Sequence, residues 1–243
     1  MIGSIAAVHS AQGTKLNMEH PLPPAPFIAG ALGLDVLNSL ARPVDDLVDW
    51  WSNGDDFLSW MKQAGLLADN DMAVAKSNMS ANDLDRVAAN ARELREWFRG
   101  FVKAHNGKPL KAQALTQLGP LKRLLEIDEV FWSLEPEPAS SPKEPSGNES
   151  ATRFRLQARR RWLKPESLLA PVAQAIAEFV VSADFRYVKA CHGQNCILFF
   201  LDRTRRHGRR WCSMAVCGNR AKQDAHLARR KKRKPSAKQR NPS

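Results

Sequence analysis

The chain has 243 residues, of which 43% are hydrophobic and 26% are charged, so it can bury a globular core. No stretch approaches the ~20 apolar residues that a membrane span requires, and the composition excludes collagen-like, coiled-coil and wholly disordered chains. The net charge of +12 is unevenly divided: residues 1–150 hold 14 basic and 20 acidic side chains, whereas residues 151–243 hold 23 and 5. This asymmetry predicts a regulatory part joined to a part that binds a polyanion.

The N-terminal half carries mainly helical patterns. Residues 1–26 contain a proline cluster without apolar periodicity and are expected to form a disordered arm. Apolar residues then recur at helical spacing in four segments, expected to be helices: 28–40, 55–65, 84–101 and 112–126. Gly65 is a stop signal for the second of these, and a kink is expected at Pro120 in the fourth.

A change of period after residue 129 predicts a β-hairpin. Apolar side chains alternate along 130–134, and along 154–162 they alternate with arginines, which indicates a strand with one apolar and one basic face. Residues 135–151, rich in Pro, Ser and Glu, are expected to form a flexible loop between the strands. We expect the hairpin to pack on the helices, and a further helix to follow over 166–182.

All four cysteines, Cys191, Cys196, Cys212 and Cys217, lie within 27 residues, in two pairs that each enclose four residues. This spacing favours one structural Zn²⁺ with four thiolate ligands, over ordinary buried cysteines or a thiol redox switch. Strands over 197–201 and 209–211 are expected to bring the pairs together, and a helix is expected from Ser213. Clustered thiols without a secretory signal predict a cytoplasmic protein with reduced cysteines.

The cysteine segment and the tail after it are strongly basic. On the predicted helix, Asn219, Lys222, His226 and Arg229 share one stripe, and such a stripe can enter the major groove of double-stranded DNA. Arginines around the expected turn suit phosphates. The candidate DNA-binding residues are Arg205, Arg206, Arg209, Arg210, Asn219, Arg220, Lys222, His226, Arg229 and Arg230.

These patterns predict a mainly α-helical fold with small β elements. The expected organisation is a helical domain over 27–184 that includes the β-hairpin, a four-cysteine zinc finger of β-hairpin and helix over 185–232, and a basic disordered tail over 233–243. Asp35 and Asn38 lie one turn apart on an apolar helix and are the best candidate pair for a small-molecule ligand. A helix cap or an inter-helix hydrogen bond is the structural alternative for this pair.

The run from Arg209 to Lys222 resembles the CGNR zinc finger, whose motif is here Cys217-Gly218-Asn219-Arg220. The run from Phe27 to Asn38 is similar to the opening of the ABATE domain, behind which this finger usually follows. The resemblance covers about 27–232 and implies a stress-induced bacterial transcription regulator with the four cysteines as zinc ligands.

Three classes of function compete on the sequence. The favoured one is a DNA-binding regulator, whose N-terminal domain senses an effector or mediates oligomerisation, a homodimer being one option. The alternative is an adaptor whose zinc finger binds structured RNA or protein. An enzyme is not expected, because no glycine-rich phosphate loop, zinc-protease motif or nucleophile elbow occurs and a four-cysteine zinc site has no open position.

Overall fold

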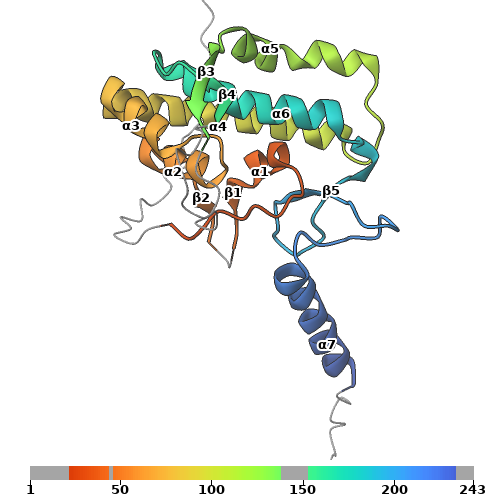
Figure 1. The fold of residues 1–243 in the computed structure, drawn as a ribbon. Helices are drawn as coiled ribbons and strands as arrows, with labels where there is room; N and C mark the ends of the chain where they lie inside the picture. Colours follow the sequence, from red (N-terminus) through yellow and green to blue (C-terminus); the bar gives the residue numbers. More distant parts are fainter. Residues whose placement is uncertain (1–21, 44–45, 138–152, 234–243) are drawn as a thin grey trace, which may run out of the picture.

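The computed structural model describes residues 22–43, 46–137 and 153–233, with side chains described as far as residue 230 (Figure 1). Its N-terminal part contains the helices α1 (Leu32–Asn38), α2 (Gly54–Gln63), α3 (Asp69–Asn78) and α4 (Ala81–His105), and the two-residue strands β1 (Leu40–Ala41) and β2 (Val48–Asp49). A 3-10 helix over Ala112–Leu118 then leads into α5 (Gly119–Glu126).

The second half begins with the antiparallel pair β3 (Val130–Pro136) and β4 (Phe154–Arg160). A 3-10 turn over Pro165–Leu169 leads into α6 (Ala170–Ser182), and a second one, Phe185–Tyr187, into β5 (Val188–Ala190) and β6 (Phe199–Leu201). A π-helical turn, Met214–Gly218, precedes α7 (Asn219–Arg233). In the described part of the chain, no helix is both long and apolar enough to cross a membrane. The mainly helical fold with small antiparallel hairpins is therefore confirmed.

The core is built around α4. A capping box starts this helix, because the Asp83 N–H donates to Ser80 Oγ and the Ser80 N–H donates to the Asp83 carboxylate, both at 3.1 Å. Its apolar stripe, which includes Leu84, Val87 and Phe98, is buried against the neighbouring helices. The largest fully buried side chains are the tryptophans at 50, 51 and 60.

Three expectations about the N-terminal part are corrected. The first helix covers only Leu32–Asn38, because Gly30 adopts a φ of 79° and breaks the helical path before it. Residues 22–26 of the expected disordered arm pack on the body, where the Pro23 carbonyl accepts the Trp50 indole N–H at 2.6 Å. The sequence did not predict α3, since Ala75 is its only buried residue and no apolar stripe marks it.

Pro120 starts a helix instead of kinking one. The 3-10 helix ends at Leu118 and α5 begins at Gly119, with Pro120 in its first turn. At this position the missing N–H of proline leaves no hydrogen bond unmade. Of the expected loop over 135–151 and tail over 233–243, residues 138–151 and 234–243 lie outside the described residues.

The β3–β4 hairpin forms as expected, and its apolar face is turned outward. Directly paired residues share a face, and the pair Leu134–Leu156 lies on the same face as Trp132 and Phe154. All four of these side chains are exposed. The opposite face turns toward the helices, where Arg159 pairs with Glu135 at 2.6 Å and lies 3.9 Å from Asp71 at the start of α3. Polar contacts therefore join the hairpin to the body: Arg159 lies near Asp71, and Arg160 donates to the Gln174 side chain of α6.

The expected strand pairing after Cys196 is also corrected. β6 pairs with β5, and residues 209–211 form no strand. The other edge of β6 is occupied by the N-terminal part: the Phe199 N–H donates to Asn38 Oδ1 at 3.1 Å, the Asn38 amide donates to the Phe199 carbonyl at 3.0 Å, and the Leu201 N–H donates to the Ala29 carbonyl at 2.8 Å. β6 therefore has no free edge for a return strand, and the Arg210 carbonyl instead accepts the His192 N–H, beyond the end of β5, at 2.9 Å.

The close packing of α1 on α6 depends on Gly33, because a Cβ at this position would lie 2.5 Å from the Phe179 Cβ. We predict that Gly33→Ala lowers the free energy of unfolding by roughly 1–3 kcal/mol, since backbone and a buried ring must shift. Gly100→Ala in α4 is the matched control: a Cβ there meets nothing within 4 Å, so it should stabilise by about 0.5–1 kcal/mol. Chemical denaturation measures both, and equal effects would contradict the packing assignment.

Candidate metal centre and basic surface

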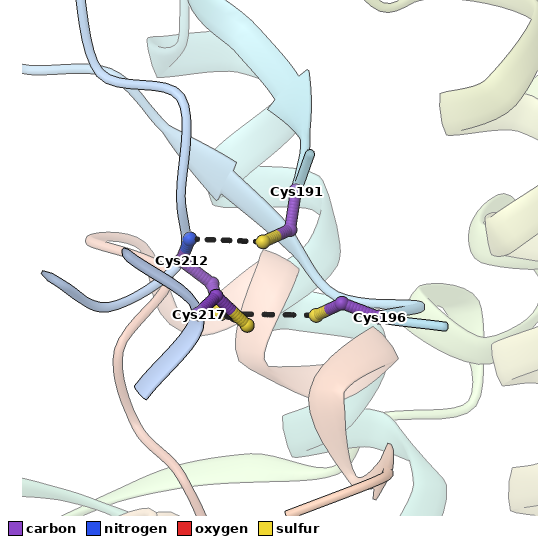
Figure 2. Close-up of side chains that lie close together, drawn as sticks. All are labelled: Cys191, Cys196, Cys212 and Cys217. Carbon is purple, nitrogen blue, oxygen red and sulfur yellow. Dashed lines mark hydrogen bonds between the residues drawn. The ribbon is translucent and has the colours of Figure 1, made fainter. Parts of the chain in front are cut away.

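Four short segments bring the cysteines together. Cys191 directly follows β5, Cys196 lies in the turn before β6, Cys212 lies in the loop beyond β6, and Cys217 lies in the π-helical turn before α7. Their sulfur atoms all lie within 4.8 Å of one another, with 3.8 Å between Cys196 and Cys212 and 3.6 Å between Cys212 and Cys217 (Figure 2). The expected convergence of the two pairs is thus observed.

The arrangement fits a tetrahedral metal ion. Zinc–sulfur bonds of about 2.3 Å place the ligand sulfurs about 3.8 Å apart, close to the two sulfur–sulfur distances above. The backbone N–H groups of Gly193 and Cys212 donate to Cys191 Sγ at 3.3 and 3.2 Å, as suits a thiolate. A Cβ at Gly193 would lie 2.8 Å from Cys217 Sγ, so only glycine lets this turn approach the cluster.

The thiols cannot all ionise without a cation. Hydrogen bonds from Cys196 and Cys212 lower the pKa of Cys191 to about 2. The contact with Cys191 raises the pKa of Cys196 to about 12 and also raises the pKa of Cys212, while burial raises the pKa of Cys217. The protein alone therefore stabilises one thiolate, and the charge of a divalent ion is needed to hold four.

The loop after β6, residues 202–210, carries five arginines and is called the basic loop here. It is organised by Asp202, which the sequence analysis did not single out. This buried carboxylate accepts the Lys189 ammonium at 2.7 Å and the backbone N–H groups of Thr204 and Arg209 at 3.0 and 2.9 Å. Burial raises the pKa of Asp202, but these donors outweigh it and hold the pKa well below its usual range. His207 completes the loop by stacking on Tyr187, with ring centroids 3.6 Å apart.

Arg209 has a structural environment, unlike its neighbours. Its guanidinium donates to the carbonyls of Trp211, Cys212 and Ile28. It also lies over the Phe200 ring, 4.3 Å from the centroid. The geometry therefore favours a role for Arg209 in joining the cysteine loop to the N-terminal segment, in place of the predicted contact with phosphate.

The three other arginines predicted in this loop are exposed, as phosphate contacts require: Arg205, Arg206 and Arg210. Arg210 lies 5.1 Å above the Trp211 ring centroid, which orients its guanidinium at the surface. The predicted loop residues therefore divide into an exposed group and the internally bonded Arg209.

The predicted helical stripe lies on α7. This helix projects from the body of the molecule into solvent (Figure 1). Four of the predicted residues on it are exposed: Lys222, His226, Arg229 and Arg230. Arg220 is half-buried beside the cysteine turns. Asn219 is exposed, and its amide donates to the Ala215 carbonyl at 3.2 Å, which ties the first turn of α7 to the π-helical turn.

The candidate ligand pair in α1 has internal partners. Asp35 is buried and accepts the Ala29 N–H at 2.9 Å, and Asn38 is buried against β6. Both side chains bond to backbone between segments, so the geometry favours the structural alternative for this pair. Nearby, Arg99 of α4 donates to the Leu37 carbonyl at 2.6 Å and to the Ile197 carbonyl at 3.4 Å, and so bridges α1 and the cysteine segment.

Comparison with protein families finds one model that matches the helical part of the chain and another that matches the cysteine part. A family model described as "Putative stress-induced transcription regulator", named ABATE, matches residues 30–183. The model of the CGNR zinc finger matches residues 187–230, which include all four cysteines. The resemblance read from the sequence is confirmed. A search of curated proteins finds none that matches the chain.

Asp35 gives the fold a pH dependence of its own. Burial raises its pKa to about 6, outweighing the Ala29 and Ile28 N–H groups, which lower it. Because the folded protein binds this proton more tightly than the unfolded chain, stability should rise as the pH falls from 7 to 5, by roughly 1 kcal/mol from this group. Asp35→Asn should remove that increment. The increment is measured as the difference in unfolding free energy between the wild type and Asp35→Asn at each pH, because the contribution of the cysteines is the same in both proteins. A difference that does not change with pH would contradict the raised pKa of Asp35.

Proposed function

Since the chain belongs to the ABATE family and carries a CGNR zinc finger, we propose that it is a zinc-dependent transcription regulator that binds double-stranded DNA. In this proposal the cysteines hold one structural Zn²⁺. The basic loop and α7 supply the DNA contacts, and the domains are those expected from the sequence, with the N-terminal one regulating the finger. The observation that carries the proposal is a one-sided charge balance beside the cysteine cluster.

That balance can be followed residue by residue. The exposed bases of the loop and α7 include Arg203, Arg205, Arg206, Arg210, Lys222, Arg229 and Arg230. The segment from 202 to 230 has two acids, Asp202 and Asp224. Asp202 is buried and paired with Lys189, which leaves Asp224 as the one exposed acid among these described residues. A surface of this kind attracts phosphates strongly, because little internal charge competes with them.

The metal's role in this proposal is mechanical. Four thiolate ligands leave no open position, so a bound Zn²⁺ supplies a cross-link between the cysteine turns and no site for hydrolysis. The residues it joins determine where the DNA contacts lie: Cys212 follows the basic loop by two residues, and Cys217 comes two residues before α7. Loss of the cluster would therefore separate the two basic elements.

The form of α7 suits a groove. Between Lys222 and Arg230 every side chain is exposed, so the helix gains little from packing on its own chain. The major groove of B-DNA admits an α-helix, and Asn, Lys and Arg side chains can bond base edges or phosphates there. Asn219 stands at the N-terminal end of the helix, but its bond to Ala215 must be released or shared if it is to contact a base.

We predict one zinc per chain, lost when any cysteine is replaced by serine. Cys217→Ser should release the metal and abolish DNA binding, while most of the helical circular dichroism remains, because most helical residues belong to α1–α6, which lie outside the cysteine turns. Zinc is measured by a colorimetric chelator on the purified protein. Ser213→Ala, in the same loop but not in the cluster, is the control. Retention of a full zinc equivalent by Cys217→Ser would contradict the four-ligand site.

We also predict that the loop arginines contribute charge and not sequence reading. Arg205→Ala and Arg206→Ala should weaken binding to every duplex alike, and each should lower the slope of log affinity against log salt by about 0.9. Arg86→Ala, an exposed arginine on α4, is the matched control and should leave the slope unchanged. Fluorescence anisotropy with a labelled duplex provides the affinities.

Asn219→Ala separates base reading from a structural role. If Asn219 reads a base, the change should cost roughly 1–3 kcal/mol on a selected site and little on random DNA, with zinc retained. Equal losses on both would refute base reading. Selection of bound genomic fragments by the wild type identifies the site, and preferential recovery of structured RNA would instead favour the adaptor function.

A further inference from the structure

The outward face of the β3–β4 hairpin carries the largest unexplained feature of the surface. Trp132 is 67% exposed, Leu134 75%, Phe154 72% and Leu156 61%. Nine of the seventeen large hydrophobic residues that are exposed in the described part of the chain lie in this hairpin and the segments flanking it, between Leu125 and Leu163. Single exposed apolar residues are ordinary, whereas a contiguous group marks an interaction surface.

The register makes these four side chains one patch. Leu134 is directly opposite Leu156, and Trp132 and Phe154 occupy the next positions of the same face on their own strands. Pro136 and Ala158 extend this patch, which contains no polar side chain over these six positions; the next pair on the same face is Val130 and Arg160, and Arg160 is paired with Asp128. We name this set, Trp132, Leu134, Pro136, Phe154, Leu156 and Ala158, the hairpin face.

We propose that the hairpin face is the site of homodimerisation, packed face to face against the same six residues of a second copy of this chain. An isolated two-stranded hairpin is marginally stable in water, and a second hairpin stacked on it supplies the missing layer. Because both copies contribute the same surface, the contact closes around a two-fold axis.

The area of the face matches what a dimer needs. An aromatic side chain can bury about 150–250 Å², so the two aromatic residues and two leucines at these exposures offer on the order of 500 Å² per chain. A standard interface buries about 800 Å² per partner, and about 65% of a homodimer interface is apolar, which is again about 500 Å². A face without charged side chains is typical of an interface that stays covered, and a second copy is the one partner always present.

Part of the charge beside the hairpin face is compensated. The chain has a net charge of +12, but three arginines of β4, Arg155, Arg159 and Arg160, form ion pairs within the chain. Glu135 accepts Arg159 and Arg155, at 2.6 and 3.5 Å, and Asp128 accepts Arg160 at 2.9 Å. Two copies can therefore approach through this face with these three guanidinium groups already neutralised by their partners.

Sedimentation of the full chain, loaded with zinc, tests the proposal. The wild type should be a dimer at micromolar concentration, and Leu134→Glu should weaken the association by about 100-fold or more, because a carboxylate would be buried without a partner. Leu156→Glu, directly across the hairpin, should act alike. Val181→Glu is the matched control: Val181 is 87% exposed on α6, outside the face, and its variant should remain dimeric.

Two results would overturn the proposal: a wild type that is monomeric up to about 100 μM, or an equal loss of association in Leu134→Glu and Val181→Glu. The first would point to another occupant of the face, such as a different protein or residues 1–21 of the chain itself. The proposal deepens the proposed function but fails separately from it. Arg205→Ala should remain dimeric while it loses affinity for DNA, and monomeric Leu134→Glu should keep the salt dependence of the wild type on a short duplex that holds one finger.

Discussion

The structure depends on what happens at the outer edge of β6. One edge of this short strand pairs with β5, and the other receives the Asn38 side chain, which donates to and accepts from the Phe199 backbone as a neighbouring strand would. An exposed backbone edge is costly to bury without partners, so this side chain permits Phe199 to lie in the protein interior. The cysteine segment is thereby fixed on α1 and is not joined to the helical part by a linker alone.

Two further contacts stiffen the same junction. Arg99 bonds the Leu37 carbonyl at the end of α1 and the Ile197 carbonyl before β6, and Arg209 bonds the Ile28 carbonyl from the far side of the cysteine loop. Because each guanidinium spans two segments, a movement of α1 must also move the cysteine turns. If the N-terminal domain regulates the finger, as proposed, these contacts offer a physical route from α1 to the basic loop.

Local sequence signals predicted the local features well. The paired spacing of the cysteines placed four sulfurs in one cluster, and Gly65, with a φ of 70°, stands where the second helix stops. The alternation along 130–134 and 154–162 also predicted the hairpin. These patterns are encoded within a few residues of one another, where helix periodicity, capping and turn geometry act.

Features that depend on distant residues could not be predicted in the same way. A period of two shows that a strand has two faces, but it does not show which face meets the body; here the inward face carries Arg159, which lies 3.9 Å from Asp71 of α3, a residue far away in the sequence. Asn38 and Phe199 are 161 residues apart, so nothing near Asn38 in the sequence distinguishes an edge-pairing amide from a ligand-binding one. The expected return strand over 209–211 failed for the same reason, since the edge it needed was already filled.

The placement of the two outward-facing surfaces bears on how they could work together. The hairpin lies at one end of the molecule and α7 projects from the other (Figure 1). A contact through the hairpin face would leave both basic helices in solvent, so dimerisation and DNA binding would not compete for the same surface. Each copy would then bring its own phosphate contacts, and the binding of one finger would raise the effective concentration of the second near the same DNA. Such an arrangement would strengthen binding only where two DNA sites lie at the distance that separates the two fingers of the dimer. Because the junction with α1 fixes that distance, the spacing of the sites would determine recognition together with their sequence.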